Sequence, residues 1–211
     1  TIFIANEFFD SIAIKQFIKI KNLWFEKYVK VEKNKSRFFF NKKFDMKKFE
    51  KKINFNISEN QNFIEYSASG LEYLKIITKL IKKNNGGILI VDYGYFEKKM
   101  KNTLRAISNH KYSNILENIG KSDITYDINF YIFRKLINQL GGVRDIVTTQ
   151  RDFLIKMGIE KRAEILSKNQ IFSRKADIYY RLKKLIDKNQ MGNVFKVMFI
   201  KRQENNYKLG F

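Results

Sequence analysis

The chain has 211 residues and a mass of 25.3 kDa, which is enough for one domain with a buried core. Apolar residues make up 44 %, a globular rather than a disordered composition, and 42 Lys and Arg against 21 Asp and Glu give a formal net charge of +21. The chain has no cysteine and one histidine, which excludes disulfide scaffolds, cysteine nucleophiles and thiolate or histidine-rich metal centres. No metal site is predicted.

The basic charge has two explanations. Phe, Tyr, Met, Ile, Asn and Lys, whose codons are AT-rich, account for 119 of the 211 residues, and 33 of the 42 basic residues are lysines spread over the whole chain. We therefore favour a solvated lysine surface produced by codon bias in an AT-rich genome. A functional basic surface that binds nucleic acid or an anionic membrane is the alternative. No apolar run approaches the roughly 20 residues that a membrane span needs, so no span is expected.

Strands separated by a lysine-rich region are predicted in the first third of the chain. β-Branched and aromatic runs indicate a buried strand at residues 1–5 and a short strand at 63–66. Two further runs, 24–31 and 36–41, are joined by a short polar turn and predict an antiparallel ladder. Residues 45–52 fit a short helix. The chain starts inside a strand and without an initiator Met, so we expect a fragment of a longer protein.

A helix, a glycine turn and a strand follow. Ser69 and Glu72 fit a capping box, and apolar residues at helical spacing predict a helix that continues to Ile81. Two glycines end this helix, and the continuous apolar run 88–91 predicts a fully buried strand. This succession is typical of a crossover into a parallel sheet, so the fold class is α/β.

Short helices and two strands are predicted in the last half. An irregular stretch at 96–125 comes first, followed by a helix through 130–140 capped by Asp127 and a strand at 143–148. A helix from Thr149 to Gly158 is next, and two more helices are expected at 161–167 and 174–188. A turn at Met191 and Gly192 leads into the last strand, at 194–200.

Polar residues directly after the first strand are the most informative candidates for a site. Asn6, Glu7 and Asp10 are interleaved with two phenylalanines, at a strand end where open α/β sheets place ligands. Carboxylates among aromatic rings suit a cationic ligand. The alternative is a helix cap made by Asn6 or Asp10, and the local sequence supports both equally. No glycine-rich nucleotide loop and no P-loop are present.

Two further candidates are less specific. Asp92 and Tyr93 follow the second buried strand, although the simpler interpretation of that position is a turn. His110 could act as a base, but a lone histidine in an irregular segment is more often an ordinary polar residue.

The string Ala-Asn-Glu-Phe-Phe-Asp at residues 5–10, followed by Lys-Gln-Phe at 15–17, resembles the hallmark of the MidA-like S-adenosylmethionine-dependent methyltransferases. This family includes the mitochondrial complex I assembly factor that methylates protein arginine. Further blocks resemble the family in the same order, at 64–67, 86–94, 103–106 with His110, 122–125 with Asp127 and Phe130, 148–154, 158–163 and 191–197. Two prolines usual in the family are missing, at Ala13 or Ile14 and at Val147–Thr148.

The resemblance implies the later strands of a Rossmann-like class I methyltransferase sheet. Residues 1–5, 88–92 and 143–148 would be its fourth, fifth and sixth strands, and 194–200 its last, antiparallel strand. The family's glycine-rich cofactor loop and ribose-binding acid would precede Thr1. We therefore expect residues 1–211 to form a single truncated domain that lacks the N-terminal part of the sheet. Insertions at 22–60 and 96–128 would surround the substrate mouth.

The function implied is methyl transfer from S-adenosyl-L-methionine to an arginine of a protein, a respiratory complex I subunit or its bacterial equivalent. The location implied is the cytoplasm of an AT-rich bacterium, or the mitochondrial matrix in a eukaryote. An RNA methyltransferase and a non-catalytic basic nucleic-acid-binding module remain as alternatives. The residues that the resemblance assigns are Glu7 and Asp10 for catalysis, Ala5 and Asn6 for the cofactor, and Asp92, Tyr93 and His110 for the substrate mouth.

Overall fold

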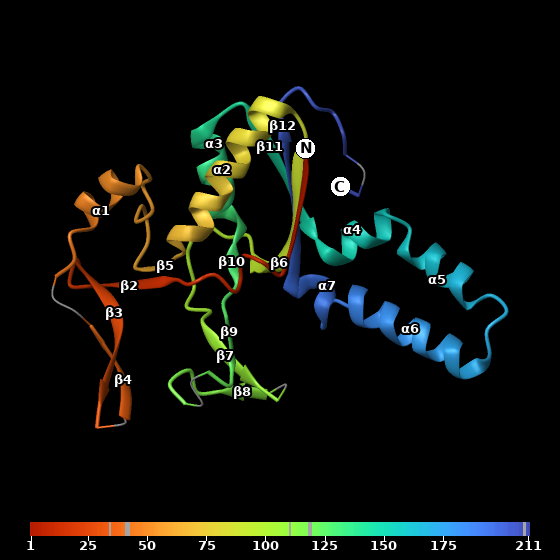
Figure 1. Ribbon diagram of the computed structural model, residues 1–211, viewed down its shortest axis with the longest axis horizontal. Helices are drawn as coiled ribbons and strands as arrows, with labels where there is room; N and C mark the ends of the chain where they lie inside the picture. The colour runs from red at the N-terminus through yellow and green to blue at the C-terminus, as the bar shows by residue number, and fades with distance from the viewer. Residues whose placement is uncertain (34, 41–42, 110, 118–119, 209) are drawn as a thin grey trace.

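The central sheet has the strand order β1-β6-β12-β11 (Figure 1). In the computed structural model, which describes residues 1–33, 35–40, 43–109, 111–117, 120–208 and 210–211, β1 is parallel to β6, whereas β12 is antiparallel to both β6 and β11. The bounds are β1 Ile2–Asn6, β6 Gly87–Tyr95, β12 Phe195–Arg202 and β11 Val143–Thr149. The predicted parallel neighbours and the antiparallel last strand are confirmed. β10, Ile128–Asn129, pairs with the far end of β6.

Two helices cover one face of this sheet. α2, Ala68–Asn84, and α3, Phe130–Leu140, lie against the face that carries Ile88 and Ile90 of β6 (Figure 1). Leu74 and Ile81 of α2 are fully buried there, which contributes on the order of 2 kcal/mol for each side chain. The other face is covered near β11 and β12 by α4, Gln150–Lys156.

The edge strand β1 buries only one of its two faces. Phe3 and Ala5 pack toward the core, whereas the side chains of Ile2 and Ile4 are 79 % and 75 % exposed. Within the described part of the chain, β6 is the only strand hydrogen-bonded to β1. The second edge of β1 and the Ile2 and Ile4 side chains are therefore uncovered, which is unusual for a parallel strand.

A second, antiparallel sheet has the order β4-β3-β2-β5. Its strands are β2 Lys15–Ile20, β3 Leu23–Glu32, β4 Lys35–Phe40 and β5 Phe63–Tyr66. α1, Met46–Ile53, packs on it through aromatic rings: the Phe17 centroid lies 4.7 Å from that of Phe44 and 5.4 Å from that of Phe49. The predicted ladder is confirmed, but the sheet occupies residues 15–66, a wider segment than the predicted insertion 22–60.

The stretch predicted to be irregular forms a third sheet, β8-β7-β9. Its strands are β7 Arg105–Ser108, β8 Lys111–Ser113 and β9 Asp123–Thr125. Strands of three or four residues are too short to show an alternating pattern, so this sheet could not be predicted from the sequence.

The chain between β11 and β12 is helical. α5, Ile159–Ser167, and α6, Phe172–Ile186, form a hairpin that extends away from the central sheet (Figure 1), and α6 has no buried residue. Each begins about two residues earlier than predicted. The turn predicted at Met191 and Gly192 is wrong, because residues Met191–Val194 form the short helix α7.

Two predicted helix caps are displaced by two residues. Ser67, not Ser69, caps α2: its hydroxyl accepts from the Gly70 amide at 3.1 Å and donates to the Ala13 carbonyl at 3.1 Å. Asn129, not Asp127, caps α3, because the Asp127 carboxylate pairs with Arg105. The predicted cap of α4 by Thr149 is confirmed.

Replacing Ser67 by Ala should lower the free energy of unfolding by about 1–2 kcal/mol, because one amide and one carbonyl lose their partner. Ser69→Ala is the matched control and should change it by less than about 0.5 kcal/mol, the usual range at exposed positions. Urea denaturation of both variants checks this. A larger loss of unfolding free energy in Ser69→Ala than in Ser67→Ala would show that Ser69 caps the helix, as the sequence predicted.

Candidate active site

The ends of β1 and β6 lie side by side at the carboxyl edge of the central sheet. Asn6 is in register with Val91, and the Glu7 amide donates to the Val91 carbonyl at 2.9 Å. β1 ends at Asn6, whereas β6 continues through Asp92 to Tyr95, so the turn expected after Val91 is not present. The two strand ends that the sequence marked as candidate sites therefore lie together at one edge of the sheet.

Asp92 is a buried anchor for the loop that follows β1. Its side chain has no solvent exposure. One carboxylate oxygen accepts from the backbone amides of Phe9 at 2.9 Å and Asp10 at 3.4 Å, and the other accepts from the Tyr93 amide at 2.9 Å. The structure thus places Asp92 beneath the loop, and not at the exposed mouth where the sequence suggested it.

The buried carboxylates hold protons unusually well. Burial and the neighbouring Asp10 carboxylate raise the pKa of Asp92 to about 7, although its three amide donors oppose the shift. Burial and the Glu7 carboxylate also raise the pKa of Asp10, whereas the Arg105 guanidinium and backbone amides oppose this. Near neutral pH the Asp92 carboxyl is therefore partly protonated.

Glu7 is presented to solvent by an unusual backbone conformation. Its φ of +47° lies in the left-handed region, which costs a residue with a side chain about 1–2 kcal/mol. This conformation turns the chain so that Phe9 is fully buried, with its ring 5.2 Å from that of Phe133. Glu7 stays exposed, and the side-chain amide of Asn6 donates to its carboxylate at 3.4 Å. Ala5, before them, is buried.

Tyr93 and Arg105 border the same carboxylates. The Tyr93 ring packs on Phe195 at 4.1 Å between centroids, and the Arg105 guanidinium lies 5.3 Å from the Tyr93 centroid. Burial and the Glu7 charge raise the pKa of Tyr93, with Arg105 opposing. The sequence did not predict Arg105 as a site residue, because the third sheet, in which Arg105 begins β7, is what places it beside these carboxylates.

A polar network that the sequence did not reveal fixes the chain before Arg105. The Glu65 carboxylate accepts from the Thr103 amide at 2.8 Å, the Thr103 hydroxyl at 2.7 Å and the Gln16 side chain at 2.7 Å. The Thr103 hydroxyl in turn accepts from the Asp127 amide at 2.9 Å. Glu65 thus connects the second sheet to the segment that carries Arg105.

Other aspects of the predicted site can be placed only in part. His110 lies outside the described residues. Within the described residues there is no group of three or more His, Cys, Asp or Glu that could hold a metal ion. None of the helices in that part of the chain is both long and apolar enough to cross a membrane.

Comparison with known proteins places the chain in a family. Residues 1–147 match the profile of a family described as "Putative S-adenosyl-L-methionine-dependent methyltransferase". The chain belongs to this family. The MidA-like resemblance is thereby confirmed, and S-adenosyl-L-methionine is the cofactor of the family.

Curated relatives are longer than this chain. It is 29 % identical over 203 residues to the mitochondrial protein arginine methyltransferase NDUFAF7 of Danio rerio. The aligned residues cover 93 % of this chain and 46 % of that relative. It is 32 % identical over 165 residues to the NDUFAF7 homologue of Caenorhabditis elegans. That alignment covers 77 % of this chain and 38 % of the relative. The chain thus spans about half the length of the curated relatives that it matches, or less.

Two solved structures from Burkholderia thailandensis share the fold over the whole of this chain. An uncharacterised protein has a TM-score of 0.82 at 18 % identity, with 57 % of its own chain covered. A second, bound to S-adenosyl-homocysteine, has a TM-score of 0.78 at 19 % identity, with 55 % covered.

The raised pKa of Asp92 predicts how stability changes with pH. Between pH 4 and 7 the folded protein holds a proton on Asp92 that the unfolded chain has released, so the free energy of unfolding should fall as pH rises. Asp92→Asn should remove up to about 1.4 kcal/mol per pH unit of that slope.

Denaturation at several pH values checks the slope, and Asp123→Asn, at an exposed carboxylate, is the control. Parallel curves for the wild type and Asp92→Asn would show that Asp92 is ionised throughout this range.

Proposed function

We propose that the intact protein transfers a methyl group from S-adenosyl-L-methionine to a guanidinium nitrogen of a protein arginine. The observation that carries the proposal is the group of carboxylates at the joined ends of β1 and β6: exposed Glu7 beside buried Asp10 and Asp92. The names of the curated relatives, which are protein arginine methyltransferases, support the same acceptor.

The proposed chemistry needs positioning more than covalent help from the protein. The bound cofactor supplies a methyl group on a sulfonium cation. Glu7 holds the guanidinium through paired charge-assisted hydrogen bonds, which leaves one nitrogen directed at the methyl group. Asp10 has a pKa raised by burial and by Glu7, which suits it to accept the proton that the guanidinium releases. Tyr93 borders the site, with Phe195 and the Arg105 guanidinium packed against its ring.

The residues present fit one side of a cofactor site. Exposed Asn6 lies at the carboxyl end of an edge strand, and the exposed Glu7 carboxylate beside it favours a cationic sulfonium. We propose that Ala5 and Asn6 border the cofactor and that a segment preceding Thr1 forms the other side. In this proposal residues 1–211 are part of a longer methyltransferase domain.

The uncovered edge of β1 supports this proposal. An apolar cavity of about 520 Å³ lies beside it, with Ile2, Ile4, Leu89 and Phe199 among its lining residues. A further strand would pair with the free edge of β1, and a helix would cover these side chains, because both faces of a parallel sheet are normally buried. The segments 22–60 and 96–128 are proposed to frame the substrate mouth, with Tyr93 and His110 at its lining.

The protein partner is proposed to be a respiratory complex I subunit or its bacterial equivalent. The location proposed with it is the cytoplasm of an AT-rich bacterium, or the mitochondrial matrix, where the names of the relatives place them. The second candidate acceptor is RNA, favoured by the net charge of +21.

Residues 1–211 alone should bind S-adenosyl-L-methionine weakly, because they supply one side of the proposed site. Isothermal titration calorimetry should give a dissociation constant above about 100 μM for this chain, against about micromolar for a chain extended upstream, a difference of roughly 3 kcal/mol. Micromolar binding by residues 1–211 would show that no further segment is needed.

Glu7→Gln in the intact protein keeps the shape of the side chain and removes its charge. We expect kcat for arginine methylation to fall about a hundredfold, since charge-directed positioning of a reacting group contributes several kcal/mol. Glu160→Gln, at an exposed position on α5, is the control and should leave kcat unchanged. A lowered melting temperature with normal kcat would instead give Glu7 a purely structural role.

A further inference from the structure

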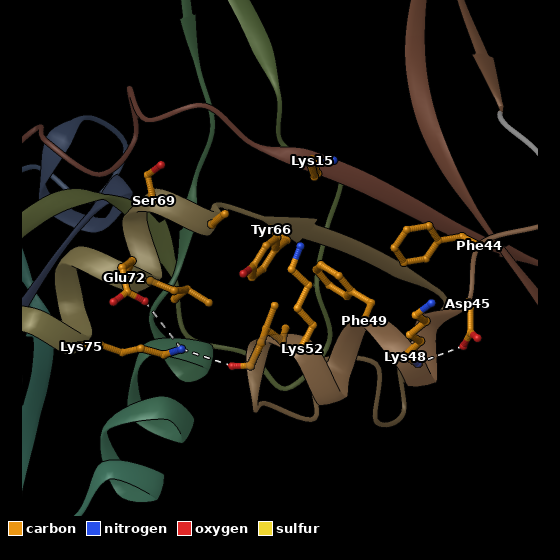
Figure 2. A pocket seen from close by; sticks show the side chains of 13 residues that line it. Lys15, Phe44, Asp45, Lys48, Phe49, Lys52, Tyr66, Ser69, Glu72 and Lys75 are labelled. Atoms are coloured by element: carbon orange, nitrogen blue, oxygen red, sulfur yellow. Dashed lines mark hydrogen bonds and ion pairs between the residues drawn. The ribbon is translucent and has the colours of Figure 1, made fainter.

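A groove of about 960 Å³ lies between α1, the end of β5 and the first turns of α2 (Figure 2). Its floor is aromatic: the Phe49 ring lies 5.4 Å from Phe44 and 5.1 Å from Tyr66, measured between centroids. Figure 2 shows lysine side chains around these rings, contributed by β2, α1 and α2. The proposed chemistry of the carboxylate site makes no use of this groove.

The protein itself neutralises only part of the positive charge on the rim of the groove. Of the four lysines on the rim, Lys15 pairs with Glu26 at 2.7 Å, and Lys75 pairs with Glu72 at 4.0 Å and donates to the Ile53 carbonyl at 3.2 Å. The ammonium groups of Lys48 and Lys52 have neither an ion-pair nor a hydrogen-bond partner among the described residues. These two lysines are one helical turn apart on α1 and exposed, so both are available to an anionic ligand.

The groove adjoins the candidate active site through two shared segments. Asp10 and Lys15 are five residues apart, and Lys15 is in register with Tyr66 on the neighbouring strand. Ser67, next to Tyr66, is hydrogen-bonded to Ala13. The segments that follow the carboxylate site in the chain therefore also border the groove.

We propose that this groove binds an acidic segment of the polypeptide whose arginine enters the candidate active site. This inference rests on the proposed function and specifies its substrate class. Unpaired lysines above an apolar floor suit glutamate and aspartate side chains followed by apolar ones.

Nucleic acid fits the groove less well. Tyr66 is only 7 % exposed and packs edge-on against Phe49, so it offers no free face on which a base could stack.

The test uses the intact protein and fluorescein-labelled peptides with one arginine followed by a run of either glutamates or glutamines. Fluorescence anisotropy should show about tenfold tighter binding of the glutamate peptide, as expected for a few partly exposed ion pairs. The double substitution Lys48→Glu with Lys52→Glu should abolish this preference. Lys47→Glu with Lys51→Glu, the same change on another face of α1, is the matched control and should preserve it.

Equal binding of the two peptides by the wild type would overturn the inference, and methylation of both would leave the proposed function intact. If the acid preference persisted but no peptide were methylated, the groove assignment would stand and the proposed function would fail. A single-stranded oligonucleotide of the same charge that binds more tightly, and through Lys48 and Lys52, would overturn the acidic polypeptide in favour of RNA.

Discussion

The site depends on one buried carboxylate. Asp92 points inward from β6. Its carboxylate accepts hydrogen bonds from the backbone amides of Phe9 and Asp10, in the loop after β1, and of Tyr93, in β6. A buried acid without partners would cost several kcal/mol, so the loop after β1 is held where its amides reach this side chain. The left-handed backbone at Glu7 persists because pairing of β1 with β6 holds the chain before it, and Asp92 and buried Phe9 hold the loop after it.

The electrostatic character of the site follows from this arrangement. Burial and the neighbouring Asp10 carboxylate raise the pKa of Asp92, and burial and the Glu7 carboxylate raise that of Asp10. The Arg105 guanidinium opposes the shift at Asp10, and it also pairs with Asp127. The edge of the sheet therefore stays acidic in a chain that is strongly basic overall. This local reversal of charge favours a cationic ligand at the strand ends, while the lysines of α1 favour an acidic one at the neighbouring groove.

The central sheet was predictable from the sequence because its strands are rich in apolar and β-branched residues, and two of them, β6 and β11, start at or directly after a pair of glycines. The position of Asp92 was not, since an acidic residue after an apolar run resembles the start of a turn until its partners are known. Arg105 and Glu65 gave no local signal either, as their roles arise from contacts between different sheets. The displaced caps have a similar cause: Ser67 is preferred to Ser69 because it also reaches Ala13, a contact distant in sequence.

The most direct test of this account is a carbon-13 NMR titration of the aspartate carboxyl groups, with Asp92→Asn used to assign the Asp92 resonance. If Asp92 is the buried anchor of the loop beside a second carboxylate, its resonance should titrate with a pKa of about 7. A pKa near 4, the ordinary value for a solvated aspartate, would contradict the account.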